Sequence, residues 1–409
     1  MSKHRVLESN MFGFVTQFMI LLMLFTCFQI SIIYMNGISG LLSGSYVERV
    51  LIYGAYYLSF MVANLVYPNF SKKYIQTYNM YFWLVLAIIS SLTSLCTIAT
   101  QFILLPLILA GIALGVGMPC CLSYFADHTE IENRGKTGGI IFFLTSLAMP
   151  IFSFLYKMIG LYSFCVFSTI WFSTGLIFLL LLKPKGEVVE RRKDLSLVSV
   201  IVNKQFYLYF ISWVIYSLID NLGFSILRLF LQETFGLAFK DLVLNLSTII
   251  MAFSIVSVGF VIDTYGRKRA LLYGFIALGI AYACIGINPL NLFFWYLYFV
   301  ISGIASGFFV VIFVFTIWGD ISSKGAREKY YAIGSLPFFF MVFIREILSP
   351  YMVDVPVSTA FSFASFFLFL AVLPLIYAPE TLPEKEIKRR ELRDYIRKAK
   401  KIAGKYAKG

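Results

Sequence analysis

Apolar stretches long enough to cross a lipid bilayer recur from one end of this chain to the other. A spanning helix needs about twenty apolar residues at a rise of about 1.5 Å per residue. Runs of that length between polar breaks predict twelve helices, at residues 12–35, 47–67, 80–99, 102–125, 138–157, 161–182, 205–232, 241–262, 270–287, 291–318, 330–352 and 357–377. Because 60% of the residues are hydrophobic and only 13% are charged, a water-soluble fold could not bury the apolar surface. We therefore expect an all-α integral membrane protein.

The positive charges are divided unevenly between the two sides of this predicted bundle. Of the 34 lysines and arginines, only Arg49, Lys157 and Lys240 lie in or beside the loops of one side, and Arg228 and Arg345 fall within helices. The others lie in the loops of the opposite side and near the two ends of the chain. This bias marks the cytoplasmic side, so we expect a multi-pass protein of the cell membrane with both termini in the cytoplasm. The net charge of +13 does not indicate a nucleic-acid partner, because it is divided among many loops.

The predicted helices form two groups of six. We expect an N-terminal six-helix bundle at residues 1–182, a cytoplasmic linker at 183–204, a C-terminal bundle at 205–378 and a basic tail at 379–409. Apolar residues of the tail recur three and four positions apart among lysines and arginines, a pattern typical of an amphipathic helix. Such a helix would lie on the anionic inner leaflet, with membrane lipid as its partner. A solvated tail is the alternative.

Groups that could support enzyme chemistry are few. The chain has two histidines, His4 and His128, and its six cysteines lie inside apolar runs without the spacing of a metal site or a disulfide framework. The one acidic cluster in a loop, Asp127, Glu130 and Glu132 around His128, is the only material for an intramembrane enzyme. We expect no enzyme, no metal and no cofactor, and we expect the protein to be a monomer.

Small residues four apart occur at equivalent places in the two groups of helices. Gly111 and Gly115 in the fourth predicted helix recur as Gly303 and Gly307 in the tenth. Glycines at this spacing allow two helices to approach closely without a hydrophobic driving force. We expect these four glycines to pack helices tightly, either as static contacts or as smooth faces that move during function.

A second repeated pattern follows the same two helices. Asp127 with Arg134 recurs as Asp320 with Arg327, at nearly the same offset as the glycine pairs. Two patterns in the same order indicate an internal duplication. Many secondary transporters are built from such repeats and hold their substrate near the middle of the membrane between them.

The loop after the eighth predicted helix carries the most specific motif. It contains, in order, Gly259, Asp263, Gly266, Arg267 and Lys268. At these positions the chain resembles the major facilitator superfamily, whose motif reads G-x-x-x-D-R-x-G-R-R. The resemblance implies twelve helices in two six-helix pseudo-repeats and transport of a small solute.

The resemblance also implies a latch that closes the cytoplasmic side while the outer side is open. Its expected members are Gly259, Asp263, Gly266, Arg267, Lys268, Asp127, Arg134, Asp320 and Arg327. In the copy of the motif after the second helix, Pro68 replaces the aspartate, although Lys72 and Lys73 keep the basic pair. We therefore expect an asymmetric latch, stronger in the second half of the chain.

Two further features bear on the branch of the superfamily. The pattern of an acid, six residues and an arginine resembles the sugar-porter and organic-ion branches, as does Pro379-Glu380-Thr381 after the last helix. The glutamine pair that sugar porters carry in the seventh helix is missing, and Asp220 and Asn221 occupy that stretch.

Charged residues also lie at membrane depth, where they are costly and point to function. Asp220 in the seventh helix and Arg345 and Glu346 in the eleventh fall at similar depths, counted at about 1.5 Å per residue. We expect Asp220 to pair with Arg345, which would leave Glu346 for a proton or a substrate hydroxyl. Asn221 and Gln29 complete the candidate substrate and coupling residues. A purely structural ion pair is the alternative.

These observations favour a secondary transporter that moves a small organic solute by alternating access between its two halves, with a sugar or polyol as the preferred substrate. One alternative is a proton-coupled carrier of an organic ion, drug or metabolite, in which Asp220 recognises a cation or carries a proton. The alternative from another class is a non-transporting membrane sensor or scaffold.

Overall fold

The computed structural model describes residues 3–41, 45–70, 76–97, 102–184 and 196–382. Lys72, Lys73, most of the predicted linker and the predicted amphipathic tail helix lie outside the described residues.

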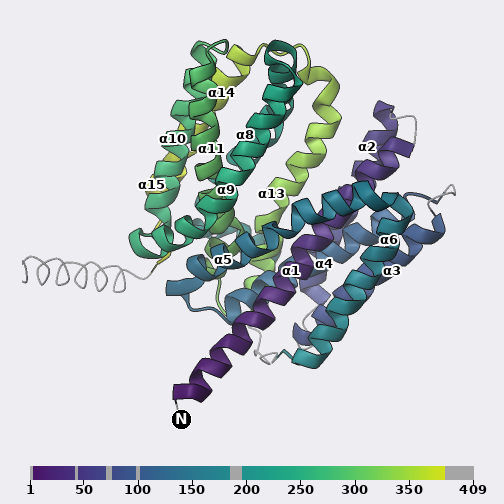
Figure 1. Cartoon of the computed structure of the whole chain (residues 1–409). Coiled ribbons are helices and arrows are strands. Elements are labelled where there is room, and N and C mark those ends of the chain that lie inside the picture. Colours follow the sequence, from purple (N-terminus) through teal and green to yellow (C-terminus); the bar gives the residue numbers. More distant parts are fainter. Residues whose placement is uncertain (1–2, 42–44, 71–75, 98–101, 185–195, 383–409) are drawn as a thin grey trace, which may run out of the picture.

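The first half of the chain folds into long helices that match its apolar runs. Their bounds are α1 Lys3–Leu41, α2 Tyr46–Phe70, α3 Gln76–Thr97, α4 Leu105–Asp127, the short η2 Ile131–Asn133, α5 Arg134–Ser146 and α6 Ala148–Leu182. These helices form one group, which we call the N-half (Figure 1).

A glycine separates two membrane crossings inside α6. The apolar stretch Ile131–Leu182 has 52 residues, which is far more than one crossing of about 30 Å needs. Gly160 interrupts it with φ 74° and ψ 175°, a conformation that glycine adopts without steric cost. The chain therefore changes direction there, so the eleven spanning-length stretches of the described residues contain twelve crossings.

The second half folds in the same manner. Its helices are α7 Leu197–Val202, α8 Lys204–Phe235, α9 Leu237–Tyr265, α10 Arg267–Ile287, α11 Leu292–Val310, the π-helix η3 Val311–Thr316, α12 Ile317–Ile321, α13 Arg327–Leu348, η4 Ser349–Met352, α14 Val357–Leu370 and α15 Val372–Tyr377. The helices α8 to α15 form the C-half, and α7 lies in the segment between the halves.

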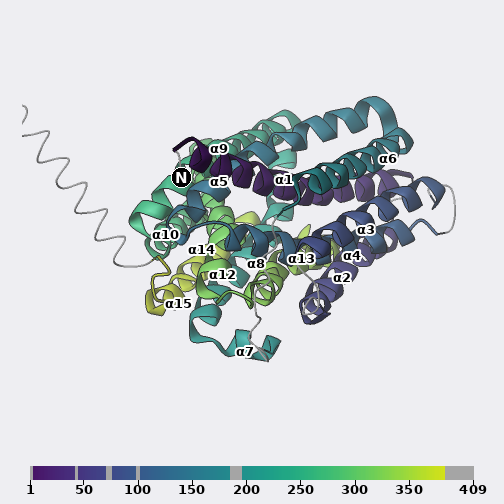
Figure 2. The ribbon, with the colours of Figure 1, turned by 90° about the horizontal axis from the view of Figure 1, so that it is seen from below.

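The two halves meet along two pairs of helices. Helix α5 packs against α9, and α2 packs against α13, which also contacts α4. Figures 1 and 2 show these pairs at the border between the purple-to-blue N-half and the green-to-yellow C-half. The buried apolar side chains of the two halves therefore form one continuous cluster across this interface.

The glycines of the repeated pairs, Gly111, Gly115, Gly303 and Gly307, each face a neighbouring helix at short distance. A Cβ atom on Gly115 would lie 2.6 Å from the carbonyl oxygen of Phe60 in α2, and one on Gly303 would lie 2.9 Å from that of Ser247 in α9. The glycines thus join α4 to α2 and α11 to α9, inside each half rather than between the halves.

Candidate functional site

The repeated acidic and basic residues exchange partners between the halves. Arg134 of the N-half pairs with Asp320 of the C-half, and Arg327 of the C-half pairs with Asp127 of the N-half. All four side chains are largely buried, with Asp320 at 0% exposure. We call the end of the bundle where these residues lie the basic end. The duplication therefore produces a reciprocal pair of ion pairs that ties the halves together there.

Asp320 is the centre of this network. Besides Arg134 it pairs with Arg267, whose Nε lies 2.8 Å from Oδ2. The hydroxyl of Thr381, just beyond the last helix, donates a hydrogen bond of 3.3 Å to the same oxygen. Asp320 thus holds together the N-half, the start of α10 and the segment after α15.

Asp263 closes the interface between α9 and α5. Its carboxylate accepts hydrogen bonds from the backbone N–H groups of Gly135 (3.1 Å) and Lys136 (2.7 Å) at the start of α5, where the partial positive charge of a helix N-terminus favours an anion. The backbones approach closely here, since a Cβ atom on Gly259 would lie 2.6 Å from the carbonyl oxygen of Gly135. The same carboxylate lies 3.5 Å from Arg267.

Lys268 and Gly266 serve the C-half itself rather than the contact between halves. The Lys268 ammonium donates to the carbonyl oxygen of Ile376 at 2.8 Å, and its backbone N–H donates to Glu380 at 3.0 Å. Gly266 has φ 97° and lies directly against Glu380. We expected both residues in the latch, but they anchor the segment after α15 to the start of α10.

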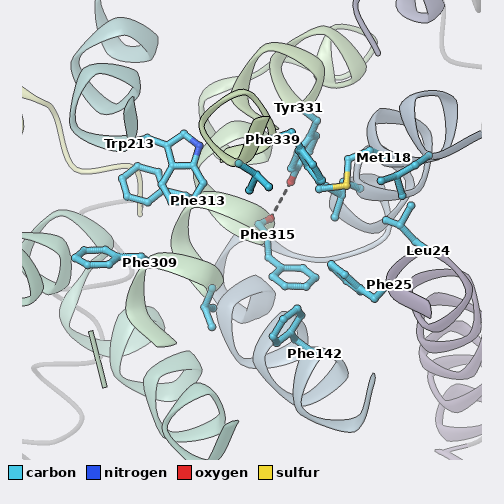
Figure 3. Close-up of a cluster of buried hydrophobic side chains, with 14 of the residues drawn as sticks. Leu24, Phe25, Met118, Phe142, Trp213, Phe309, Phe313, Phe315, Tyr331 and Phe339 are labelled. Atoms are coloured by element: carbon cyan, nitrogen blue, oxygen red, sulfur yellow. Dashed lines mark hydrogen bonds between the residues drawn. The ribbon is translucent and has the colours of Figure 1, made fainter. Parts of the chain in front are cut away.

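A layer of aromatic rings lies beside the ion pairs. Phe315, on the π-helix of the C-half, inserts among Phe25, Phe125 and Phe142 of the N-half, with ring centroids 5.6 to 5.8 Å apart. Figure 3 shows Phe315 facing Phe25 and Phe142, with its backbone oxygen accepting a hydrogen bond of 2.8 Å from Tyr331. π-helical turns often mark functional sites, and this one presents Phe315 to the other half.

A cavity of about 510 Å³ lies between the two halves. Helices α1, α4, α5 and α6 of the N-half line it together with α8, α9, α11, η3, α12 and α13 of the C-half. Its volume falls within the range of pockets that hold small organic ligands.

One face of α8 forms the wall of this cavity that carries an acid. Trp213, Tyr216, Asp220, Phe224 and Leu227 line it at three- and four-residue spacing. The hydroxyl of Tyr216 donates to Oδ1 of Asp220 at 3.4 Å. Asp220 is the only carboxylate on the cavity wall among the described residues, and no lysine, arginine or histidine joins it there.

Comparison with known protein families agrees with this architecture. The family model of the Major Facilitator Superfamily matches residues 11–285 and again residues 241–406. The chain belongs to the major facilitator superfamily. It is therefore a transporter of small solutes rather than an enzyme. A search of curated protein sequences finds no match.

Solved structures of this superfamily confirm the predicted fold. The structure of the transporter FucP in its outward conformation matches with a TM-score of 0.72 at 11% identity. The match covers 90% of this chain and 98% of FucP. The proton:xylose symporter XylE, bound to a bromodeoxyglucose, gives a TM-score of 0.67 at 13% identity, with 91% of this chain and 96% of that one covered. The human organic anion transporter MFSD10 gives 0.65 at 14% identity, with 92% and 100% covered.

The predicted ion pair between Asp220 and Arg345 is wrong. Nη2 of Arg345 lies 2.9 Å from Oε1 of Glu346, its neighbour in the chain, and the guanidinium lies 5.7 Å from the centre of the Phe224 ring. Nothing in the described part of the chain joins Arg345 to Asp220 by an ion pair. Glu346 is therefore paired with Arg345 and is not free for a proton or a substrate hydroxyl, because the two side chains are adjacent in the chain and reach each other.

The other two candidate substrate residues do not line the cavity. Asn221 is buried and donates to the backbone oxygen of Ser217 within its own helix at 2.9 Å. Gln29 donates to the hydroxyl of Ser153 at 3.4 Å, which connects α1 with α6 inside the N-half. Asp220 alone, of the five candidate substrate and coupling residues, lies on the cavity wall.

One polar contact between the halves involves a residue that the sequence patterns do not single out. Nδ2 of the fully buried Asn64 in α2 donates to the backbone oxygen of Ala332 (2.6 Å) and to the hydroxyl of Ser335 (3.2 Å) in α13. The signal was an amide inside an otherwise apolar run. Glu380 appears in the sequence only as part of the Pro379-Glu380-Thr381 motif. In the structure its carboxylate accepts a hydrogen bond of 2.9 Å from the backbone N–H of Arg267.

Proposed function

We propose that this superfamily member moves a small organic solute by alternating access between the N-half and the C-half. The observation that carries the proposal is the position of the cavity. It lies between the halves, and the aromatic layer around Phe315 and the reciprocal ion pairs lie at the basic end of the same interface.

The arrangement of contacts supports a rocking motion. Opening the basic end would separate Arg134 from Asp320 and Arg327 from Asp127, and would break the hydrogen bonds of Asp263 to the start of α5. The close glycine contacts of α4 and α11 lie within the halves, so each half can move as a body. In this proposal the conformation described here is closed at the basic end, and its cavity is accessible from the opposite side of the membrane.

The substrate is proposed from the cavity wall. A sugar or polyol, which the sequence favours, would need hydroxyl partners on several sides, but the polar side chains of this wall come from the C-half alone. The carboxylate of Asp220 supports the second candidate, an organic-ion carrier. Proton coupling at Asp220 belongs to the same alternative.

Alternating access can be tested without knowing the substrate. Ser302 lines the cavity, so a Ser302→Cys protein in sealed vesicles should react with a membrane-impermeant thiol reagent from the side opposite the basic end. Adding Arg327→Gln should shift labelling toward the basic end, because it breaks one of the two ion pairs between the halves. The parent protein reports background labelling, including that of the exposed Cys96.

If labelling stays on one side in both proteins, alternating access is wrong, and the sensor or scaffold reading gains support. If Ser302→Cys reacts equally from both sides before the gate is altered, the assignment of a closed basic end is wrong.

A further inference from the structure

The polar side chains of the cavity wall all come from the C-half among the described residues. The N-half contributes only apolar side chains among the described residues, namely Leu24, Phe25, Phe28, Leu114, Met118, Leu122, Phe142 and Met149. The C-half contributes the acid, the amide of Asn245, and the hydroxyl groups of several serines, a threonine and tyrosines. The C-half also lines the cavity with apolar side chains such as Met251, Phe299 and Phe338. A molecule held here would therefore contact hydrocarbon from both halves and polar groups from the C-half alone, so an amphipathic solute fits better than one that is polar all round.

Asp220 lies on the polar wall without a cationic partner. Tyr216 donates to one of its oxygens and lies 3.3 Å from the hydroxyl of Ser306, and across the described chain no lysine or arginine reaches Asp220 within ion-pair distance. Arg345 forms its ion pair with Glu346 and acts on Asp220 only from beyond ion-pair distance. A carboxylate in an apolar surrounding is costly unless a cation or a proton compensates it.

Aromatic rings flank this carboxylate on the same face of α8. Trp213 and Tyr216 stack with centroids 5.7 Å apart one to two turns before Asp220. Phe224 follows one turn after it, but its ring already faces the guanidinium of Arg345, so Trp213 and Tyr216 are the rings open to a ligand. Faces of tryptophan, tyrosine and phenylalanine attract cations through the ring quadrupole. The lone acid and the rings around it therefore favour the same sign of ligand charge.

We propose that the transported solute is an amphipathic organic cation, an amine with an apolar body. The ammonium group would bind Asp220 among the rings of α8, and the body would lie against the apolar wall formed by residues such as Leu24, Phe28 and Met118. An organic anion is disfavoured, because no lysine, arginine or histidine of the described residues lines the cavity. This inference rests on the proposed transport function and deepens it by naming the substrate class.

Three probes that share a phenyl ring and a butyl chain test the proposal: phenylbutylamine, phenylbutanol and phenylbutanoate. Binding to the purified protein in detergent is measured by isothermal titration calorimetry. The amine should bind most tightly. Asp220→Asn should weaken amine binding by about tenfold to a hundredfold, the range expected for losing a hydrogen bond to a charged group, and should leave the affinity for the alcohol unchanged.

Two further variants control this experiment. Asp220→Glu keeps the charge and should retain the preference for the amine. Asp241→Asn removes an acid of equal charge at a side chain that is 56% exposed and outside the cavity, and amine binding should not change. Each variant must elute as a monodisperse peak, so that loss of binding is not loss of folding.

Equal affinity for the three probes, tighter binding of the anion, no detectable binding of any probe, or unchanged amine binding in Asp220→Asn would each overturn the substrate class. None of these outcomes affects the thiol labelling of Ser302→Cys, which needs no ligand. The binding experiment can therefore reject the substrate class without rejecting alternating access, and the labelling experiment can reject alternating access without rejecting the substrate class.

Discussion

Asp127 and Asp320 occupy equivalent positions in the two repeats but have different surroundings. Among the described residues, Asp127 pairs with one arginine, Arg327, whereas the fully buried Asp320 pairs with two, Arg134 and Arg267. The difference arises because Arg267 belongs to the second-half loop motif. At the level of single residues the closure of the basic end is asymmetric.

This asymmetry predicts unequal costs for two matched substitutions. Asp320→Asn leaves the buried Arg134 without its counter-ion and leaves Arg267 only Asp263, at 3.5 Å. It should lower the free energy of unfolding by about 3–5 kcal/mol, the usual cost of breaking a buried pair from one side. Asp127→Asn leaves one arginine and should cost less. Unfolding titrations in mixed SDS and mild detergent measure both values. Equal losses, or a larger loss for Asp127→Asn, would contradict the central role of Asp320.

The interface between α5 and α9 depends on the absence of side chains at their crossing. A Cβ atom on Gly259 would come within 2.6 Å of the backbone of α5, whereas one on Gly223 in α8 would meet nothing closer than 3.6 Å. Backbone cannot move aside as a flexible side chain can, so these two glycines should respond differently to the same change.

We expect Gly259→Ala to destabilise the protein by about 1–3 kcal/mol through overpacking. Gly223→Ala, the matched control in a helix interior, should be neutral or stabilise by about 0.5–1 kcal/mol, since alanine loses less backbone entropy than glycine. The same unfolding titration compares the two. If Gly259→Ala is as stable as Gly223→Ala, α5 and α9 are not as close as described.

Across the whole molecule, the orientation in the membrane remains a prediction from charge. The excess of lysine and arginine on one side predicts that this side faces the cytoplasm. Epitope tags added after Met1 and after Gly409 should then be inaccessible to antibody on intact cells. A tag inserted at Asn288, between α10 and α11, should be accessible. Accessibility of either terminal tag would break the assignment.

The positions of the spanning helices could be predicted from the sequence, because span length depends on local apolar content and bilayer thickness alone. The repeated patterns also indicated the two halves and the acidic and basic residues that pair between them. The sequence did not indicate which charges meet. Arg134 pairs with Asp320 in the other half rather than with Asp127 in its own loop, since the packing of the halves brings the two repeats face to face.

Prediction from the sequence has the same limit at the cavity. Depth along a helix follows from residue number, so Asp220, Arg345 and Glu346 could be placed at similar levels. The direction in which each side chain points depends on how its helix is rotated and packed, and this is why Arg345 binds Glu346 while Asp220 faces the cavity without a cation. The sequence alone determined a twelve-helix membrane protein with a repeated charge motif. Only the tertiary structure decided that, of the described residues, a single acid lies on the cavity wall, because helices distant in sequence form that wall together.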